Sequence, residues 1–245
     1  MAEVANDSVN PDIRLLRGIN DLARQAPRGV DRVVEFLAEY GVMVALAAVT
    51  AWCWWRVARR SDDAPAAVAG VAWSVLAAGV TLLLGIPVRA LVARPRPYEE
   101  HDGLDVLARA HGFSFVSDRS AVAGAVAVGL FMVSRKLGAV GGLLAAAEGF
   151  GVVYLGLHYP TDVIGGYALG AATTLLLAPP ALALLTAATT ALARSRWAVL
   201  VRVPARAGAQ GGAAGERERE RGRERPRGTQ PAQRHHSAAD KDLAA

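Results

Sequence analysis

Several stretches of about 20 residues in this chain carry almost no charge, and they constrain its fold more than any other feature. At a rise of 1.5 Å per residue, a helix of about this length crosses the roughly 30 Å hydrocarbon core of a bilayer. The chain has 53% hydrophobic residues, 6% aromatic residues and a mean hydropathy of +0.26. This composition, in which Ala, Val, Leu and Gly dominate, is typical of membrane proteins and argues against a soluble fold.

The apolar stretches predict an all-α, polytopic membrane bundle with about five transmembrane helices and an N-terminal interfacial helix. We expect spans at residues 33–57, 66–92, 120–133 and 137–157, and a fifth from residue 161 towards 179. The fifth helix is expected to kink at Pro179 and Pro180 and to continue to Arg194 and Arg196.

The chain divides into three predicted regions. In residues 1–32, apolar residues recur with near-helical spacing at Ile13, Leu15, Leu16, Ile19, Leu22 and Ala23. This spacing favours an amphipathic helix along the membrane interface, although an ordinary solvated helix fits it equally well. Residues 33–203 form the transmembrane domain, with a motif core at 65–175. Residues 204–245, in which Glu alternates with Arg, are expected to form a disordered cytoplasmic tail.

The net charge of +5 does not indicate a nucleic-acid partner, because basic residues lie at the ends of the apolar stretches and in the tail. By the positive-inside rule, the basic clusters at 56–60, 135–136 and 194–196 mark cytoplasmic ends. The N-terminal segment, the loop at 89–119 and the turn at His158 then face the outside. Cys53 is the only cysteine, which excludes an intrachain disulfide and a cysteine-based metal cluster.

His158 and Asp162 lie four residues apart between the fourth and fifth predicted spans. On a helix, this spacing places both side chains on one face. A carboxylate that holds an imidazole fixes its tautomer and raises its basicity, as a histidine that attacks phosphorus or moves a proton requires. The alternative is structural: His158 caps one helix, and Asp162 lies in the first turn of the next, where the helix dipole favours an anion.

Three arginines lie on the same predicted outer side. Arg89 and Arg96 bracket the sequence ALVARP, and Arg119 follows Ser117 and Asp118 where the third span begins. Arginine suits phosphate because its planar fork donates two hydrogen bonds at once, and a serine beside helix N-terminal N–H groups adds neutral donors. The alternative is that these arginines are interfacial anchors that extend to lipid headgroups.

These residues resemble the motifs of the type 2 phosphatidic acid phosphatases, which share a fold core with bacterial acid phosphatases and vanadium haloperoxidases. The first motif of the family, Lys and then Arg-Pro after six residues, is here Arg89 followed by Arg96 and Pro97. The second, Pro-Ser-Gly-His or Pro-Ser-Asp-His, is VSDR at 116–119. The third, Ser-Arg, five residues, His, three residues, Asp, is GV at 151–152 followed by His158 and Asp162.

The resemblance implies that His158 attacks a phosphoryl group to form a phosphohistidine, and that Asp162 orients it. It implies a phosphate-binding group that comprises Arg89, Arg96, Ser117, Asp118 and Arg119. It implies no cofactor and no metal ion. The implied activity is hydrolysis of a lipid phosphate or polyprenyl diphosphate, similar to undecaprenyl diphosphate, at the outer face of a bacterial plasma membrane. Membrane lipids are the implied surroundings, and no protein partner is implied.

Two departures from the family pattern bear on the chemistry. Arg119 replaces the second-motif histidine that protonates the leaving group, and an arginine with a pKa above ~12 cannot do so near neutral pH. Val152 replaces the third-motif arginine, and Arg119, one helix away, is a candidate to supply the missing guanidinium. Because a diphosphate leaving group needs less protonation than an alcohol, a lipid diphosphate is favoured. Glu148, inside the fourth span, is a candidate auxiliary acid or a partner for a site arginine.

Two other functions are compatible with this pattern. A degenerate family member would keep the fold and bind anionic lipid headgroups without turnover, as the replacements at Arg119 and Val152 suggest. A small transporter or channel fits less well, because the ionisable residues gather at one surface rather than along a path through the membrane.

Overall fold

A computed structural model describes residues 10–101, 103–104, 106 and 112–202 of the chain. Every regular element in these ranges is a helix, which confirms the predicted fold class. Four helical segments are long and apolar enough to cross a membrane, namely Arg28–Arg60, Ala64–Glu100, Arg135–Tyr154 and Pro160–Ala193. The predicted tail at 204–245 lies outside the described residues.

The predicted spans correspond to helices of the structure, with small shifts at their ends. The first span joins α3 (Arg28–Phe36) and α4 (Val42–Trp52) through a π-helical turn, η1 (Leu37–Gly41), and ends in η2 (Cys53–Val57) and η3 (Ala58–Arg60). The second is α5 (Ala64–Val92), which the short α6 (Pro97–Glu100) follows. The others are α7 (Asp118–Val133), α8 (Arg135–Tyr154) and α9 (Pro160–Ala193), and η4 (Ala198–Leu200) comes last. As predicted, α9 continues past Pro179 and Pro180.

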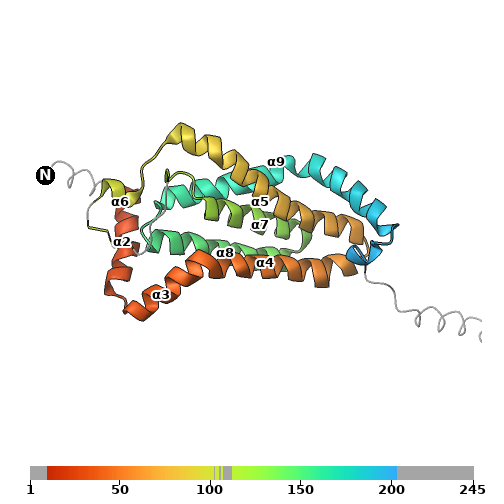
Figure 1. Ribbon diagram of the computed structural model, residues 1–245, viewed down its shortest axis with the longest axis horizontal. Coiled ribbons are helices and arrows are strands. Elements are labelled where there is room, and N and C mark those ends of the chain that lie inside the picture. The colour runs from red at the N-terminus through yellow and green to blue at the C-terminus, as the bar shows by residue number, and fades with distance from the viewer. Residues whose placement is uncertain (1–9, 102, 105, 107–111, 203–245) are drawn as a thin grey trace, which may run out of the picture. The chain divides into compact units, whose positions relative to one another are not determined.

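Helix α7 occupies the centre of the bundle, with α5, α8 and α9 packed against it (Figure 1). It has 16 residues, fewer than the four longer segments, and rises only about 24 Å at 1.5 Å per residue. Because protein surrounds it, its length does not have to match the hydrocarbon core, and side chains or neighbouring backbone can satisfy its polar ends.

A glycine allows α9 to approach the start of α7. A Cβ atom added at Gly166 would lie 2.7 Å from the carbonyl oxygen of Ser117, closer than a real Cβ can come. Small residues are the usual means of close helix packing in a membrane, where water exclusion provides little driving force. The Ser117 N–H therefore reaches the Asp162 carbonyl oxygen at 3.2 Å, and the first turns of α7 and α9 are held side by side.

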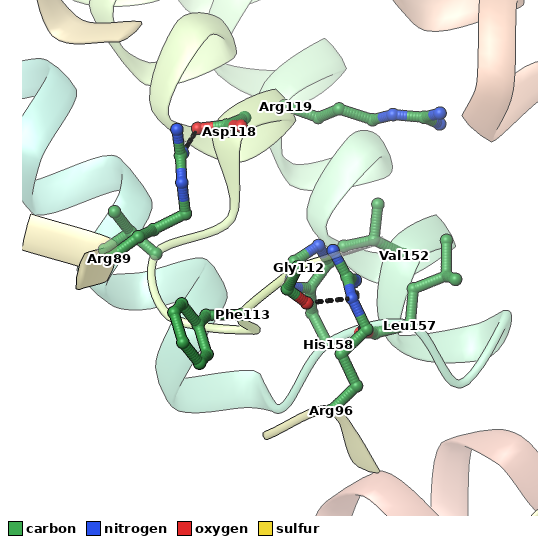
Figure 2. A pocket seen from close by; sticks show the side chains of 10 residues that line it. Arg89, Arg96, Gly112, Phe113, Asp118, Arg119, Val152, Leu157 and His158 are labelled. Carbon is green, nitrogen blue, oxygen red and sulfur yellow. Dashed lines mark hydrogen bonds and ion pairs between the residues drawn. The ribbon is translucent and has the colours of Figure 1, made fainter. Parts of the chain in front are cut away.

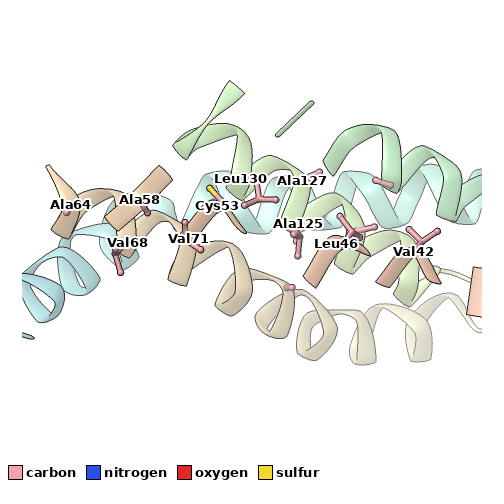
Figure 3. Packing of buried hydrophobic residues seen from close by; sticks show 14 of the residues in the cluster. Val42, Leu46, Cys53, Ala58, Ala64, Val68, Val71, Ala125, Ala127 and Leu130 are labelled. Carbon is pink, nitrogen blue, oxygen red and sulfur yellow. The ribbon is translucent and has the colours of Figure 1, made fainter. Parts of the chain in front are cut away.

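The main apolar core lies between α4, α5 and α7 (Figure 3). Its buried side chains are mostly small and include Val42, Leu46, Cys53, Ala58, Ala64, Val68, Val71, Ala125, Ala127 and Leu130. Large apolar side chains lie on the outside instead: Leu91 is 85% exposed, Leu143 74% and Leu176 76%. This distribution fits a bundle whose outer surface contacts lipid rather than water.

The predicted N-terminal helix is confirmed as α2 (Pro11–Gln25), and it is docked on the bundle. Ile13 and Leu16 are buried in one cluster with Val152 of α8. The side-chain amide of Asn20 donates to the carbonyl oxygen of Tyr154 at 3.0 Å, at the last residue of α8. Part of the apolar side that predicted an interfacial helix therefore packs against protein, next to the third-motif residues.

Candidate active site

A cavity of about 270 Å³ opens at the end of the bundle where α5 and α8 finish and α7 and α9 begin. Its lining residues are Arg89, Arg96, Gly112, Phe113, Val116, Asp118, Arg119, Val152, Leu157 and His158 (Figure 2). All three motif regions contribute to this lining. The structure thus brings together most of the residues that the sequence predicted as a site. Among the described residues, no group of three or more His, Cys, Asp or Glu side chains is placed to hold a metal ion.

A tight turn between α8 and α9 places His158. Helix α8 ends with two reverse hydrogen bonds, from the Gly156 N–H to the Val153 carbonyl and from the Leu157 N–H to the Val152 carbonyl, each 3.0 Å. This is the Schellman arrangement, which requires a left-handed residue, and Gly156 supplies it at φ 71°. Pro160 then takes the first position of α9, where its fixed φ suits a helix start.

His158 therefore precedes α9, and the prediction that it shares a helical face with Asp162 is wrong. Asp162 lies in the first turn of α9, and its Oδ2 accepts from the Tyr159 N–H at 3.1 Å, as the structural alternative expected. The same oxygen lies 3.9 Å from His158 Nδ1. The turn brings the two side chains together, so Asp162 both caps the helix and faces the histidine.

Ser114 connects the pair, although the sequence analysis did not identify it. His158 Nδ1 lies 2.9 Å from the Ser114 carbonyl oxygen, and the Ser114 hydroxyl donates a short hydrogen bond to Asp162 Oδ2. Since a carbonyl only accepts, we assign the ring proton to Nδ1, which leaves the lone pair on Nε2. The Ser114 carbonyl thus fixes the tautomer, and Asp162 acts on the histidine through Ser114 and through its charge.

The surroundings of His158 favour its neutral form. Burial lowers the pKa of the imidazole, and the positive charge of Arg96 acts in the same direction. Asp162 and the Ser114 carbonyl oppose this shift, but the net effect is a lowered pKa. The imidazole is therefore mainly neutral at neutral pH, and the neutral form is the nucleophilic form of histidine.

Arg94 is a second residue that the sequence analysis missed. Its Nη1 donates to Asp162 Oδ1 and to Thr161 Oγ1, both at 2.8 Å, and its guanidinium carbon lies 3.7 Å from the centre of the Tyr159 ring. The Asp162 side chain is fully buried, so this arginine supplies the compensating charge that a buried carboxylate needs. The repeated Arg-Pro in ARPRP was the available signal, but only its second arginine fits the first motif.

The two arginines of the first motif line the cavity in different ways (Figure 2). Arg96 is held by backbone, because its Nε donates to the Gly112 carbonyl at 2.9 Å and its Nη1 to the Leu157 carbonyl at 3.1 Å. Arg89 forms a short ion pair with Asp118. The prediction grouped Asp118 with the phosphate-binding residues, but a carboxylate repels phosphate, so any contribution from Asp118 passes through Arg89.

The remaining predicted phosphate-binding residues are placed less directly. The hydroxyl of Ser117 accepts from the Ser120 hydroxyl at 3.1 Å and caps α7, and Ser117 is not among the lining residues. Arg119 lines the cavity, but its guanidinium extends away from His158 (Figure 2). There it donates to the Ala38 carbonyl at 2.7 Å and lies 3.4 Å from Glu39 Oε1. In this arrangement the guanidinium of Arg119 does not substitute for the third-motif arginine, whose position Val152 occupies here.

Glu148 lies in α8 one turn before Val152 and is fully buried. Neither of its carboxylate oxygens has a hydrogen-bond partner among the described residues. It interacts electrostatically with Arg119 but forms no ion pair with it in the described part of the chain, and it does not line the cavity. The predicted direct pairing of Glu148 with a site arginine is therefore not present.

Sequence comparisons connect this geometry to known proteins. The family model of the PAP2 superfamily matches residues 67–182. The undecaprenyl-diphosphatase BcrC of Bacillus subtilis is 27% identical over 141 residues, which cover 56% of this chain and 67% of that protein. The putative undecaprenyl-diphosphatase YbjG of Escherichia coli is 29% identical over 163 residues, which cover 66% of this chain and 78% of that protein.

Two solved structures share the fold. LpxE of Aquifex aeolicus matches with a TM-score of 0.54 and 23% identity, over 67% of this chain and 92% of that one. The PAP2-type phosphatidylglycerolphosphate phosphatase of Bacillus subtilis matches with a TM-score of 0.51 and 21% identity, over 80% of this chain and 94% of that one. With the apolar helices, these comparisons indicate a multi-pass bacterial membrane protein, and its residues 67–182, which carry the three motif regions around one cavity, match the PAP2 superfamily.

Proposed function

We propose that this protein hydrolyses a lipid phosphate or a polyprenyl diphosphate, with His158 as the nucleophile. The observation that carries the proposal is the placement of His158. Its Nδ1 is bonded to the Ser114 carbonyl oxygen at 2.9 Å, and the residue lines a cavity beside Arg89 and Arg96. A neutral imidazole next to two guanidinium groups suits attack on a phosphoryl group, because the cations stabilise the charge on the transferred oxygens.

The reaction proceeds in two steps. In the first, Nε2 of His158 attacks phosphorus, the P–N bond forms, and the bond between phosphorus and the leaving oxygen breaks. In the second, water attacks the phosphohistidine, inorganic phosphate is released, and the imidazole returns to its neutral form. Arg89 and Arg96 bind the non-bridging oxygens in both steps. Asp162 stabilises the positive charge that develops on the ring, and Arg94 and Ser114 hold its carboxylate.

The identity of the leaving group follows from residue 119. The second-motif acid is absent, and the guanidinium of Arg119 is bonded to the Ala38 carbonyl instead. A phosphate monoester leaves with less help from a proton than an alkoxide does, so a diphosphate is the easier substrate. Two relatives carry names that include undecaprenyl-diphosphatase, which supports the same choice. The preferred substrate is therefore a polyprenyl diphosphate, which is cleaved to the polyprenyl phosphate and inorganic phosphate.

We infer that the site lies at the outer face of the membrane and the C-terminal tail in the cytoplasm. The support is the distribution of basic residues. The clusters at 56–60, 135–136 and 194–196 lie at one end of the bundle, and His158 lies at the other end. A cysteine-accessibility assay in intact cells, with Cys53→Ser and a single new cysteine at Gly103, tests this orientation. Labelling of Gly103→Cys by an impermeant reagent supports it, and protection until the cells are opened contradicts it.

A second function, headgroup binding without turnover, is favoured by the same two replacements, Arg119 and Val152. Phosphate release by the purified protein separates the two functions. The substrates are a short-chain polyprenyl diphosphate and phosphatidate, EDTA is present, and His158→Ala is the control. Release that disappears in His158→Ala supports a phosphohistidine enzyme that needs no divalent metal. No release from either lipid, with retained binding to vesicles that contain these lipids, supports the binding function.

A further inference from the structure

Asp12 of α2 caps the helix that carries the active-site aspartate. Its Oδ1 accepts from the Thr161 N–H at 3.0 Å, and its Oδ2 accepts from the Thr161 hydroxyl at 2.6 Å. Thr161 is the second residue of α9, where backbone N–H groups have no partner within the helix. The cap comes from 149 residues away in sequence, so a separate helix completes the N-terminus of α9.

The same carboxylate also binds Arg94. Asp12 Oδ2 lies 2.8 Å from Arg94 Nη2, while Arg94 Nη1 lies 2.8 Å from Asp162 Oδ1. Arg94 therefore bridges two carboxylates, one on α2 and one on α9. The Asp12 side chain is 9% exposed and that of Arg94 27%, so the pair is largely shielded from water and worth more than an exposed ion pair. A continuous set of contacts leads from Asp12 through Arg94, Asp162 and Ser114 to His158.

Packing and capping fix the position of Asp12. The Asn10 side chain caps α2 by accepting from the Asp12 N–H at 3.0 Å, and Pro11 occupies the first helical position. Just after Asp12, Ile13 and Leu16 are buried in the cluster that includes Val152. The apolar contact docks the helix, and the cap orients the carboxylate towards α9.

We propose that α2 is a part of the active site, and that Asp12 is a positioning residue that acts on His158 through Arg94 and Asp162. This proposal rests on the proposed phosphatase activity. Without the Asp12 carboxylate, Arg94 has a single carboxylate to bind, and the first turn of α9 loses its acceptor for Thr161. Asp162 and the histidine that it orients are then less restrained, and misplacement of a nucleophile slows the chemical step more than it weakens substrate binding.

The test compares Asp12→Asn with Asp21→Asn, a matched control on the same helix. Asp21 has a side chain that is 55% exposed and lies 3.7 Å from Arg24, also on α2. For Asp12→Asn we expect kcat to fall about tenfold while KM stays within about twofold. For Asp21→Asn we expect no change in either. An Asp12→Asn variant with the kcat of the unaltered protein overturns the proposal, and so does an equal fall in both variants.

A double-mutant cycle tests the route through Arg94. If Asp12 acts through Arg94, Asp12→Asn should lower kcat about tenfold in the otherwise unaltered protein and less than about twofold when Arg94→Met is already present. Losses that multiply independently overturn this route. Leu16→Ala is a second variant that loosens the docking of α2 and keeps every carboxylate. It should also lower kcat with little change in KM, and an unchanged kcat contradicts a role for the docked helix.

Hydrogen exchange separates this proposal from the proposed function. The Thr161 amide should exchange at least about tenfold faster in Asp12→Ala than in Asp21→Ala, because only the first variant removes its acceptor. This readout needs no turnover. If the unaltered protein releases no phosphate from any lipid, the phosphatase proposal fails, and the exchange rates still decide whether α2 holds the start of α9. Equal exchange in the two variants overturns the cap.

Discussion

Replacement of Arg119 by histidine should create a general acid where the family has one. Residue 119 lines the same cavity as His158, and we expect an imidazole there to donate a proton to the leaving oxygen. A positioned acid contributes a factor of about 10² to 10⁴, and 10² corresponds to about 2.7 kcal/mol of barrier. We expect Arg119→His to release phosphate from phosphatidate at least about 100 times faster than Arg119→Gln, which lacks both the guanidinium and the acid.

The glutamine control accounts for the stability that is lost when the Arg119 guanidinium is removed. Both variants lose the charge-assisted hydrogen bond from Arg119 to the Ala38 carbonyl, worth about 1.5 to 3 kcal/mol of stability, and the weaker contact with Glu39. The ratio of the two rates therefore reports what the imidazole adds, by proton donation and by its charge when protonated. On a polyprenyl diphosphate the ratio should be smaller, since that leaving group needs less protonation. Equal rates for both variants on phosphatidate would refute the assignment of residue 119 as the vacant acid position.

Three further predictions concern binding, pH and packing. Asp118→Asn removes the carboxylate that pairs with Arg89, so that Arg89 is free to bind phosphate. If the pair is worth about 1 kcal/mol, KM should fall about fivefold with kcat unchanged. A raised KM in steady-state assays contradicts this. Because burial lowers the His158 pKa below its usual 6.5, the fall of kcat/KM on the acid side, where the imidazole gains a proton, should have its midpoint below pH 6.5; a midpoint above 6.5 contradicts the lowered pKa. Gly166→Val places side-chain carbon against the Ser117 carbonyl and should lower the Tm by several degrees. Gly142 has open space around it, so Gly142→Ala should leave the Tm unchanged. Equal melting temperatures for the two variants contradict the close packing at Gly166.

Local sequence signals predicted the helices well because each depends on neighbouring residues. The apolar stretch that ends before ARPRP predicted a span to residue 92, and α5 ends at Val92. The error at His158 was also local: Pro160 marks the first position of a helix, so His158 had to precede it. Pro160 therefore indicates that Asp162 lies in the first turn of the helix and that His158 lies in the turn before it.

The residues that the sequence did not identify act over long distances in the chain. Ser114 contacts Asp162 from 48 positions away, and Asp12 contacts Thr161 from 149 away. A lone serine in a loop and a lone aspartate in an amphipathic helix carry no spacing that predicts such contacts. The motif positions predicted which residues gather, but the direction of each side chain depends on packing, as Arg119 shows by bonding to Ala38 rather than facing His158.

The replacement of the third-motif arginine by Val152 has a structural setting of its own. Val152, in place of an arginine, is fully buried and packs in one cluster with Ile13 and Leu16 of α2. An arginine there would put a charge into the apolar contact that docks α2, at a cost of several kcal/mol unless it were paired. The apolar residue at 152 is thus compatible with the docked helix, and the docked helix brings Asp12 to Arg94. In this site, α8 therefore carries an apolar residue in place of the third-motif arginine. That residue packs against α2, and Asp12 of α2 binds Arg94, which in turn binds Asp162.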